Sequence, residues 1–373
     1  MEFKMKRTEV VNVLRKVSTV KADTYQLSLS TNVEFEKGKY YCTVSACDGN
    51  AQATIAFLAQ IEKTMEEPVV VYVGAEFISI CFTMAEQNQD YVFCIEDALS
   101  ITCGEAHTSI PLKAEGKGLN PEKTEETVCV KMKSQLLKEA VLKGGYCVSK
   151  DDSRGLKNVF GFIMKLSDEK DLKLRCYTTD MYMSSACTVP VMETDKLKDA
   201  DISYGLACDR MLGLVGNLQE EETHIFLNKG QIIFRNGNDF YIFRAFEKNY
   251  PPTLESFFDK KEFACTLEVS VKELEMAIAL AALTSEERSP IILKNEENKL
   301  VVTDQLGNTS TSIDVAMEGT FDLIGCQAAF LKNVIGKIGS EKIYVGIDGS
   351  KAPMYLWNEN SAVAMVAPQT VNV

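Results

Sequence analysis

The spacing of hydrophobic residues changes early in the chain. Phe3 and Met5 alternate with polar residues, which is the period of a half-buried strand. The next apolar residues recur at intervals of three and four, which places them on one face of a helix: Val10, Val13, Leu14 and Val17. The first segment therefore predicts a strand, a short turn and an amphipathic helix.

The same change of period occurs twice more. Segments 129–141 and 266–278 align with 2–14 without gaps. Their alternating apolar residues are Val130 and Met132 in the second copy, and Leu267 and Val269 in the third. Their predicted helix faces are Leu137, Ala140, Val141 and Gly144 in the second copy, and Leu274, Ala277, Ile278 and Ala281 in the third. Thr8 and Ser134 stand where a helix N-cap is expected.

A second kind of segment also occurs three times. Residues 73–82, 206–215 and 324–333 each contain a large aliphatic residue, two small residues and then a polar residue at the start of a predicted helix. A strand hairpin follows each of them, and a strand that ends in a turn with an aspartate precedes each of them. Each third of the chain therefore holds two halves of the form βαβββ. The aspartates are Asp48, Asp180 and Asp304, and because they belong to different repeats we interpret them as turn residues and not as a metal site.

Two stretches interrupt the repeats. Residues 113–126 are rich in Gly, Pro and charge, and residues 247–256 contain a double proline. These stretches predict three domains of similar size, 1–121, 122–258 and 259–373. The fold class that we expect is α+β, with strands outnumbering helices.

Composition limits the function classes. The net charge of −13 opposes general affinity for nucleic acid, because phosphate binding depends on Lys and Arg, although a basic inner surface can coexist with an acidic exterior. The 12 cysteines are scattered without a C-x-x-C pair, which indicates reduced packing residues. No apolar run approaches the ~18–20 residues of a membrane span, and the charged N-terminal residues oppose a secretory signal, so we expect a cytoplasmic protein.

Catalytic groups do not form a recognisable set in the sequence. The two histidines, His107 and His224, are too few and too far apart for a catalytic triad or a zinc site. The glycines of segment 116–120 lack the spacing of a phosphate-binding loop. The sequence therefore indicates no enzyme, no cofactor and no metal, and an unrelated enzyme built from repeats is the weakest alternative.

The order and spacing of these segments resemble the bacterial DNA polymerase III beta subunits, the sliding clamps, over the whole chain. Besides the repeats, the resemblance rests on segments 177–183, 187–191, 243–252 and 364–371. In that family two three-domain chains close head to tail into a ring around duplex DNA, with helices lining the inside of the ring and antiparallel sheets outside.

The resemblance implies a homodimeric, non-catalytic processivity factor that binds duplex DNA without regard to sequence and is associated with the nucleoid. It implies protein partners that dock through short peptide motifs: the DNA polymerase III alpha subunit, the clamp loader and repair polymerases. The alternative is a clamp-fold regulator that binds replication-protein peptides without forming a stable DNA-encircling ring.

The resemblance also implies that basic residues on the repeated helices face DNA. The candidates lie on or near the first helix of the first two repeats and on the second helix of the third repeat: Arg15, Lys16, Lys133, Lys138, Lys143, Lys150, Arg154, Lys332 and Lys337. The third copy departs from the pattern, because Leu280 stands at the position of Lys16 and Lys143.

A peptide-binding pocket between the second and third domains is implied as well. Its residues would be Val159, Thr179, Met181, Tyr182, Met183, Pro251, Glu255, Pro353, Pro368, Gln369 and Val371. Met181, Tyr182 and Met183 stand where the family commonly has Gly, His and Arg, and Thr370 replaces the usual Arg of the tail. We therefore expect the preference for partner motifs to differ.

The dimer interface implied by the resemblance joins a strand of the first domain to the third domain of the other chain. Its residues would be Glu105, His107, Thr108 and Ile110 on one side, and Leu283 and Thr284 on the other. Acidic residues do not face basic ones here, so we expect strand pairing and apolar burial to hold the subunits together.

Overall fold

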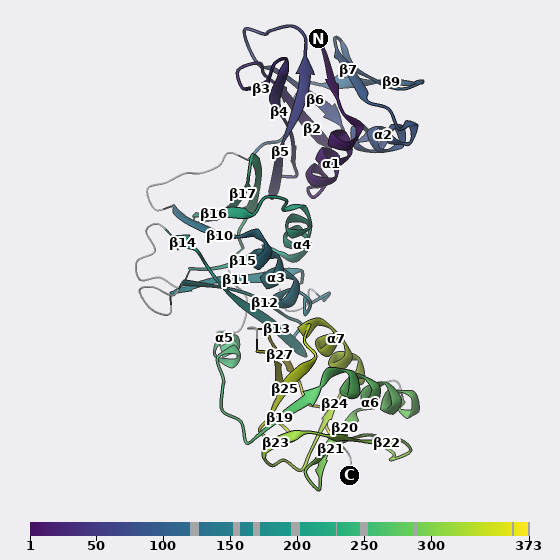
Figure 1. Ribbon diagram of the computed structural model, residues 1–373, viewed down its shortest axis with the longest axis vertical. Coiled ribbons are helices and arrows are strands. Elements are labelled where there is room, and N and C mark those ends of the chain that lie inside the picture. Colours follow the sequence, from purple (N-terminus) through teal and green to yellow (C-terminus); the bar gives the residue numbers. More distant parts are fainter. Residues whose placement is uncertain are drawn as a thin grey trace. The chain divides into compact units, whose positions relative to one another are not determined.

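A computed structural model describes most of the chain, and its elements follow the order that the repeats predict (Figure 1). The described residues are 1–119, 127–151, 157–166, 172–194, 202–228, 230–246, 253–286, 289–359 and 362–371. Within them strands outnumber helices, which confirms the α+β prediction. Within these ranges, every helix is too short or too polar to cross a membrane.

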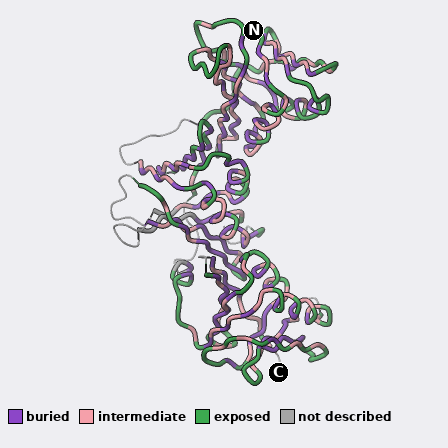
Figure 2. Tube along the Cα trace, in the orientation of Figure 1, coloured by how far each residue is buried: buried purple, intermediate pink, exposed green. Residues whose placement is uncertain are grey.

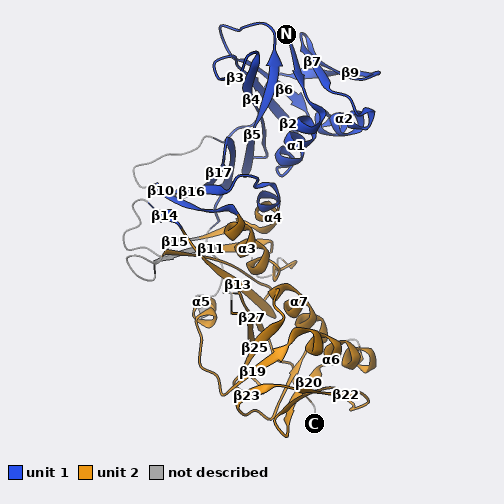
Figure 3. Ribbon diagram, viewed as in Figure 1, with its two compact units in different colours: residues 1–134, 192–198, 213–246 blue, residues 135–191, 199–212, 247–373 orange. Residues whose placement is uncertain are grey.

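The chain divides into two compact units (Figure 3). Unit 1 comprises residues 1–134, 192–198 and 213–246, and unit 2 comprises residues 135–191, 199–212 and 247–373. The three domains with boundaries after 121 and 258 are a division by sequence repeat, and they remain a prediction.

The first half of each repeat is a strand, a helix and a group of antiparallel strands. The strand and helix are β1 (Glu2–Met5) and α1 (Arg7–Val17), β10 (Val128–Lys133) and α3 (Ser134–Gly144), and β19 (Cys265–Ser270) and α6 (Val271–Thr284). The strands that follow are β2 (Thr24–Leu29), β4 (Lys39–Cys47) and β5 (Ala51–Ile61); β11 (Val159–Leu166), β12 (Leu172–Thr179) and β13 (Met183–Pro190); and β20 (Ile291–Glu296), β21 (Lys299–Asp304) and β22 (Ser310–Asp314).

The second half of each repeat has the same plan. Its strand and helix are β6 (Val69–Gly74) and α2 (Glu76–Met84), β15 (Ile202–Ala207) and α4 (Cys208–Asn217), and β24 (Leu323–Cys326) and α7 (Ala328–Ile338). Its last strands are β7 (Tyr91–Ile95), β8 (Ala98–Cys103) and β9 (Ala106–Lys113); β16 (Glu222–Asn228), β17 (Gln231–Asn236) and β18 (Asp239–Arg244); and β25 (Lys342–Ile347), β26 (Met354–Trp357) and β27 (Ala362–Val366). Shorter elements are β3 (Glu34–Glu36), the 3-10 helix η1 (Ala85–Gln87), β14 (Glu193–Thr194), α5 (Thr253–Phe258) and β23 (Ala316–Gly319).

Strand pairing repeats as well. β1, β10 and β19 each pair with the first strand of the later hairpin, which is β7, β16 or β25. β2, β11 and β20 each lie between the next strand of their own half and β6, β15 or β24. Strands of successive repeats also join, because β5 pairs with β18 in unit 1 and β13 pairs with β27 in unit 2. The same junction is therefore built twice from equivalent strands.

The predicted helix faces are confirmed. All the apolar positions assigned to the inner faces of the three first helices are buried: Val10, Val13, Leu14 and Val17; Leu137, Ala140, Val141 and Gly144; and Leu274, Ala277, Ile278 and Ala281. Figure 2 shows buried residues along the strands and exposed residues in the loops of each unit. Burial of this apolar surface is the main favourable term in folding.

Gly144 has a packing reason for being glycine. It stands at the position of Val17 in the repeat, but a Cβ there would lie 2.2 Å from the carbonyl oxygen of Cys176. The Gly144 carbonyl also accepts hydrogen bonds from the Thr178 and Ser185 hydroxyls, at 2.8 and 3.0 Å. The close approach of this helix to β12 therefore excludes a side chain.

The helix starts differ from the sequence prediction. α1 begins at Arg7 with Lys6 as its N-cap residue, so Thr8 lies inside the helix and the predicted Thr8 cap is wrong. The Ser134 hydroxyl instead lies 2.8 Å from the Thr223 hydroxyl and accepts a hydrogen bond from Asn236. Only tertiary partners across the sheet could direct that hydroxyl away from the helix.

A buried ion pair ties α1 to β18 within unit 1. The Lys16 ammonium lies 2.6 Å from the Asp239 carboxylate, and both side chains are about nine-tenths buried. The other oxygen of Asp239 accepts a hydrogen bond from the Ala56 amide of β5 at 3.0 Å. The pair therefore fastens a helix of the first repeat to the junction strands β5 and β18.

Removal of one partner should be strongly destabilising. We expect Lys16→Ala to lower the free energy of unfolding by about 3–5 kcal/mol, because it leaves the Asp239 carboxylate buried without a countercharge. Urea unfolding followed by circular dichroism measures the change. Lys4→Ala is the matched control, since its ion pairs with Glu2 and Glu62 are exposed, and an equal loss of stability in both variants would contradict the prediction.

Candidate functional site

The hairpin turn between β12 and β13 is held by side chains. The Asp180 carboxylate accepts hydrogen bonds from the amides of Tyr182 and Met183, at 2.9 and 2.6 Å. The buried Thr179 hydroxyl accepts from the Met181 amide and donates to the Met183 carbonyl, both at 3.0 Å. Asp180 is therefore a turn residue, as predicted.

The other two repeat aspartates have the same role. The Asp48 carboxylate accepts from the amides of Asn50 and Ala51, and the Asp304 carboxylate accepts from the amide of Thr309. Among the described residues, no group of three or more His, Cys, Asp or Glu side chains could hold a metal ion. The interpretation of these aspartates as turn residues is confirmed.

An apolar pocket of about 210 Å³ lies beside the turn in unit 2. Met181 and Tyr182 come from the turn, and Leu254 and Phe257 come from α5. The full lining is Thr179, Met181, Tyr182, Ser184, Leu254, Phe257, Pro353, Met365 and Ala367. Met181, Tyr182 and Phe257 are 41%, 58% and 40% exposed, so large apolar side chains surround the opening. Such an arrangement suits apolar side chains of a partner.

A buried cluster supports this pocket from below. Leu254 and Met365 belong both to the pocket lining and to a cluster with Val159, Tyr177, Ala186, Phe258 and Tyr355. Leu254 and Phe258 turn the inner face of α5 into the cluster, whereas Phe257 is exposed beside the opening. The pocket wall therefore rests on packed core and not on a loop alone.

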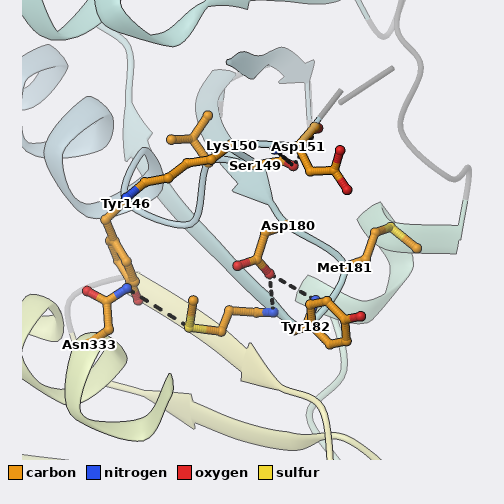
Figure 4. Close-up of a pocket in the computed structure, with 10 residues that line it drawn as sticks. Tyr146, Ser149, Lys150, Asp151, Asp180, Met181, Tyr182 and Asn333 are labelled. Atoms are coloured by element: carbon orange, nitrogen blue, oxygen red, sulfur yellow. Dashed lines mark hydrogen bonds between the residues drawn. The ribbon is translucent and has the colours of Figure 1, made fainter. Parts of the chain in front are cut away.

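Met181 and Tyr182 also line a second, more polar cleft of about 620 Å³ (Figure 4). Its lining is Tyr146, Val148, Ser149, Lys150, Asp151, Asp180, Met181, Tyr182, Met183 and Asn333. The Tyr182 ring stacks on Phe330, with ring centroids 5.9 Å apart. Burial raises the pKa of the Tyr146 hydroxyl well above its ordinary value, so this group stays protonated near neutral pH.

The structure brings together only part of the predicted pocket set. Thr179, Met181, Tyr182 and Pro353 line the apolar pocket, Met183 lines the polar cleft, and Val159 lies in the cluster below. The tail residues Pro368, Gln369 and Val371 instead line a separate cleft of about 580 Å³ with Asp322 and Lys351. Pro251 lies outside the described residues, and the Glu255 side chain is not described.

The sequence prediction missed several lining residues. They are Ser184, Leu254, Phe257, Met365 and Ala367. The sequence does contain a pattern that indicates Leu254 and Phe257. They are three residues apart, which places them on one face of a helix, and they follow a double proline, which favours a helix start. Ser184 lies near the start of β13, and Met365 and Ala367 lie near and just beyond the end of β27, so only the pairing of these two strands places them at one opening.

The basic residues predicted to face DNA differ in their surroundings. Arg15, Lys133, Lys150, Lys332 and Lys337 are exposed, and Lys138 is half-buried. The half-buried Lys143 pairs with Glu139 one turn earlier, at 2.7 Å. Lys16 is buried in its pair with Asp239, so its charge already has a partner within the protein. Arg154 lies outside the described residues.

The cysteines act as packing residues. All 12 are free thiols, and only Cys94 and Cys129 are not fully buried. Burial raises the pKa of the Cys147 and Cys208 thiols to about 12. These thiols therefore stay protonated near neutral pH, and the protonated form is a poor nucleophile.

The predicted interface residues lie on or beside β9 and at the end of α6, near β22. His107, Thr108 and Ile110 lie on β9, where Ile110 is buried, and Glu105 is exposed in the turn before the strand. β9 pairs with β6 only through Leu112 and Lys113, so residues 106–111 pair on one side alone among the described strands. In the same described part of the chain, β22 pairs only with β21. Near it, at the end of α6, Leu283 is 81% exposed and the Thr284 hydroxyl lies 2.9 Å from that of Thr309.

The Thr179 hydroxyl should be necessary for the turn. We expect Thr179→Val to lower the free energy of unfolding by about 2 kcal/mol, because the shape is kept while buried backbone groups lose their partner. Thr179→Ser keeps the hydroxyl and serves as the control. Urea unfolding of both variants tests this, and equal stability of the two would contradict it.

Comparisons with known proteins agree with this architecture. No model of a known protein family matches the chain. The beta sliding clamp of Staphylococcus epidermidis is 20% identical over 385 residues, which cover 99% of this chain and 99% of that protein. The crystal structure of the DNA polymerase sliding clamp from Bacillus subtilis matches 100% of both chains with a TM-score of 0.81 at 16% identity. That of the DNA polymerase III subunit beta from Pseudomonas aeruginosa matches 99% of this chain and 100% of its own, also with a TM-score of 0.81 at 16% identity. The repeated architecture and these full-length similarities identify the chain as a divergent homologue of the bacterial sliding clamps, the beta subunits of DNA polymerase III.

Proposed function

We propose that two copies of this chain close head to tail into a ring around duplex DNA and act as a non-catalytic processivity factor. The ring would hold the DNA polymerase III alpha subunit, the clamp loader and repair polymerases through the apolar pocket of unit 2. Each copy would supply three domains, 1–121, 122–258 and 259–373. The site of action would be the nucleoid in the bacterial cytoplasm.

The observation that carries this proposal is the repeated strand junction. β5 and β13 are equivalent strands, and they pair with β18 and β27, which are also equivalent. In the third repeat the strand equivalent to β5 and β13 is β22, and in the first repeat the strand equivalent to β18 and β27 is β9. Within the described strands β22 pairs on one side only, and residues 106–111 of β9 also pair on one side only. A third junction between β22 of one copy and β9 of the other satisfies both edges, and a head-to-tail contact of this kind can close into a ring.

The helix faces beside the junction support the same contact. In unit 1 three residues on or just after α1 contact the second repeat: Asn12 bonds Gln219, Lys16 pairs with Asp239, and Thr19 accepts from Asn217. The repeat alignment places Met276, Leu280 and Leu283 of α6 at these positions, and they are 55%, 41% and 81% exposed.

The opposing strand shows the same exchange of polar for apolar residues. Asp239 is the first residue of β18, and Ala106 is the first residue of the equivalent strand β9. A Lys–Asp pair inside the chain therefore corresponds to Leu280 opposite Ala106 of a second copy. The third domain of one copy would then contact the first domain of the other through apolar burial, as we expected from the sequence.

DNA contact would come from the exposed cations and from the half-buried Lys138. Lys332 and Lys337 lie on α7, and Lys138 lies on α3, with Arg15, Lys133 and Lys150 close to helix ends. Lys16 is left out because Asp239 neutralises it. A few exposed cations provide weak, sequence-independent attraction to phosphates, and weak attraction permits sliding.

Retention on circular DNA tests the topological part of the proposal. We expect the protein, loaded by the clamp loader of the same organism, to stay on nicked circular DNA during gel filtration at high salt and to be lost once the circle is cut. Salt screens phosphate contacts but does not open a ring, so the difference isolates encirclement. Equal loss from circular and linear DNA would favour the regulator without a ring.

The dimer contact can be tested separately. We expect Leu283→Asp to raise the dissociation constant of the dimer by at least about 100-fold, because it places a charge in the apolar contact. Analytical ultracentrifugation measures it. Leu142→Asp, at a leucine that is 55% exposed on α3, is the control and should leave the constant unchanged. A dimer unaffected by Leu283→Asp would refute this placement of the interface.

A further inference from the structure

Met181 has a backbone conformation that normally belongs to glycine. It is the first central residue of the turn between β12 and β13, and its φ is +75°, whereas Tyr182 does not have a positive φ. Glycine is the residue normally found where a hairpin turn requires a positive φ at its first central position. A side chain there clashes with the neighbouring carbonyl oxygen, so the position is strained for methionine.

The equivalent turn of the first repeat has glycine at this position, so it is not strained. In that turn Asp48 plays the role of Asp180, and Gly49 has a φ of +90° at the position of Met181. The Asn50 carbonyl accepts from the Arg244 amide after the β5–β18 junction, as the Tyr182 carbonyl accepts from the Ala367 amide after the β13–β27 junction. The two turns are equivalent, and only one of them contains a side chain at this position.

The surroundings hold Met181 in place. The Thr179 hydroxyl accepts from the Met181 amide, the Asp180 carboxylate accepts from the two amides that follow, and the Ser184 hydroxyl donates to that of Thr179 at 2.8 Å. Strain persists only where neighbouring structure over-determines the conformation, and such positions concentrate at functional sites.

Core packing does not explain the side chain. Met181 is 41% exposed, and Figure 4 shows it pointing away from the Asp180 carboxylate. Together with Tyr182 it lines both the apolar pocket and the polar cleft, and these are the two residues that the linings share. Met181 is therefore part of the wall between two cavities.

We propose that Met181 is the residue that determines which peptide side chains the apolar pocket accepts; this rests on the peptide-docking role proposed above. At about 210 Å³ the pocket is below the ~300 Å³ typical of small-molecule sites, so it suits individual side chains of a peptide. With the wall intact the pocket selects an unbranched or γ-branched aliphatic residue, Leu or Met. The flanking polar residue of the peptide then faces the cleft of Lys150 and Asp151. Without the wall the two cavities join and admit an aromatic ring.

Selection from a phage-displayed library of random nine-residue peptides tests the proposal. Met181→Gly removes both the side chain and the strain, whereas Met181→Ala removes the side chain and keeps the left-handed conformation. Glu297→Gly is the matched control: Glu297 also has a positive φ, of 53°, but it lies in the exposed β20–β21 turn and lines neither cavity.

We expect wild type and Glu297→Gly to enrich the same Leu- or Met-containing peptides, and both Met181 variants to enrich peptides with Trp, Phe or Tyr instead. Synthetic versions of the wild-type peptides should bind the Met181 variants about tenfold more weakly, because a contact of a methionine side chain is lost. The unfolding midpoint should rise or stay unchanged in Met181→Gly and in Glu297→Gly, because both variants relieve a positive φ. Only Met181→Gly should change the selected peptides, so relief of backbone strain alone does not account for a change in selection.

The outcomes separate the two proposals. If wild type enriches peptides that both Met181 variants bind with unchanged preference and affinity, Met181 has no role in selection and this inference is overturned alone. If wild type enriches no peptide, or the enriched peptides are unaffected by Phe257→Ala in the same pocket, the peptide-docking role fails and this inference with it.

Discussion

Hydrogen bonding along the edges of the sheets is the constraint on which the other features depend. An open edge strand presents unpaired N–H and C=O groups, and the chain satisfies two such edges by pairing β5 with β18 and β13 with β27. The buried Lys16–Asp239 pair fastens a helix beside the first junction. The apolar pocket opens at the end of the second, where Tyr182 accepts a hydrogen bond from Ala367 just beyond β27. Structural and candidate functional features thus follow the same repeated contact.

Equivalent positions of the repeats have acquired different chemistry. One helix position is Lys16 in a buried ion pair, Lys143 in a half-buried pair with Glu139, and the exposed Leu280. The turn position is a relaxed Gly49 in the first repeat and a strained Met181 in the second. The backbone arrangement is the same in each repeat, but the residues around equivalent positions differ. These neighbours determine whether a side chain is paired, buried or exposed to a partner.

Net negative charge is compatible with a role on DNA under this plan. The exposed lysines of the described helices are few, and one lysine that the sequence placed among them is neutralised by Asp239. Retention by a closed ring does not depend on strong phosphate binding, and strong binding would slow movement along the duplex. The acidic excess of the chain, −13 in all, then limits nonspecific contacts.

Much of the fold could be read from the sequence alone. The three strand–helix repeats and their buried faces, from Val10 and Leu14 to Ile278 and Ala281, follow from hydrophobic periodicity, which is a local property of the backbone geometry. The turn roles of Asp48, Asp180 and Asp304 are local as well, because each carboxylate bonds amides within five residues of itself. Local geometry therefore accounts for what the sequence determined.

Tertiary structure decided the rest. That Lys16 is buried depends on Asp239, which is distant in sequence, and periodicity contains no information about that partner. Met365 and Ala367 reach the pocket only because β27 pairs with β13, and the tail residues Pro368, Gln369 and Val371 turn to another cleft. Long-range pairing sets these features, so no local pattern could reveal them.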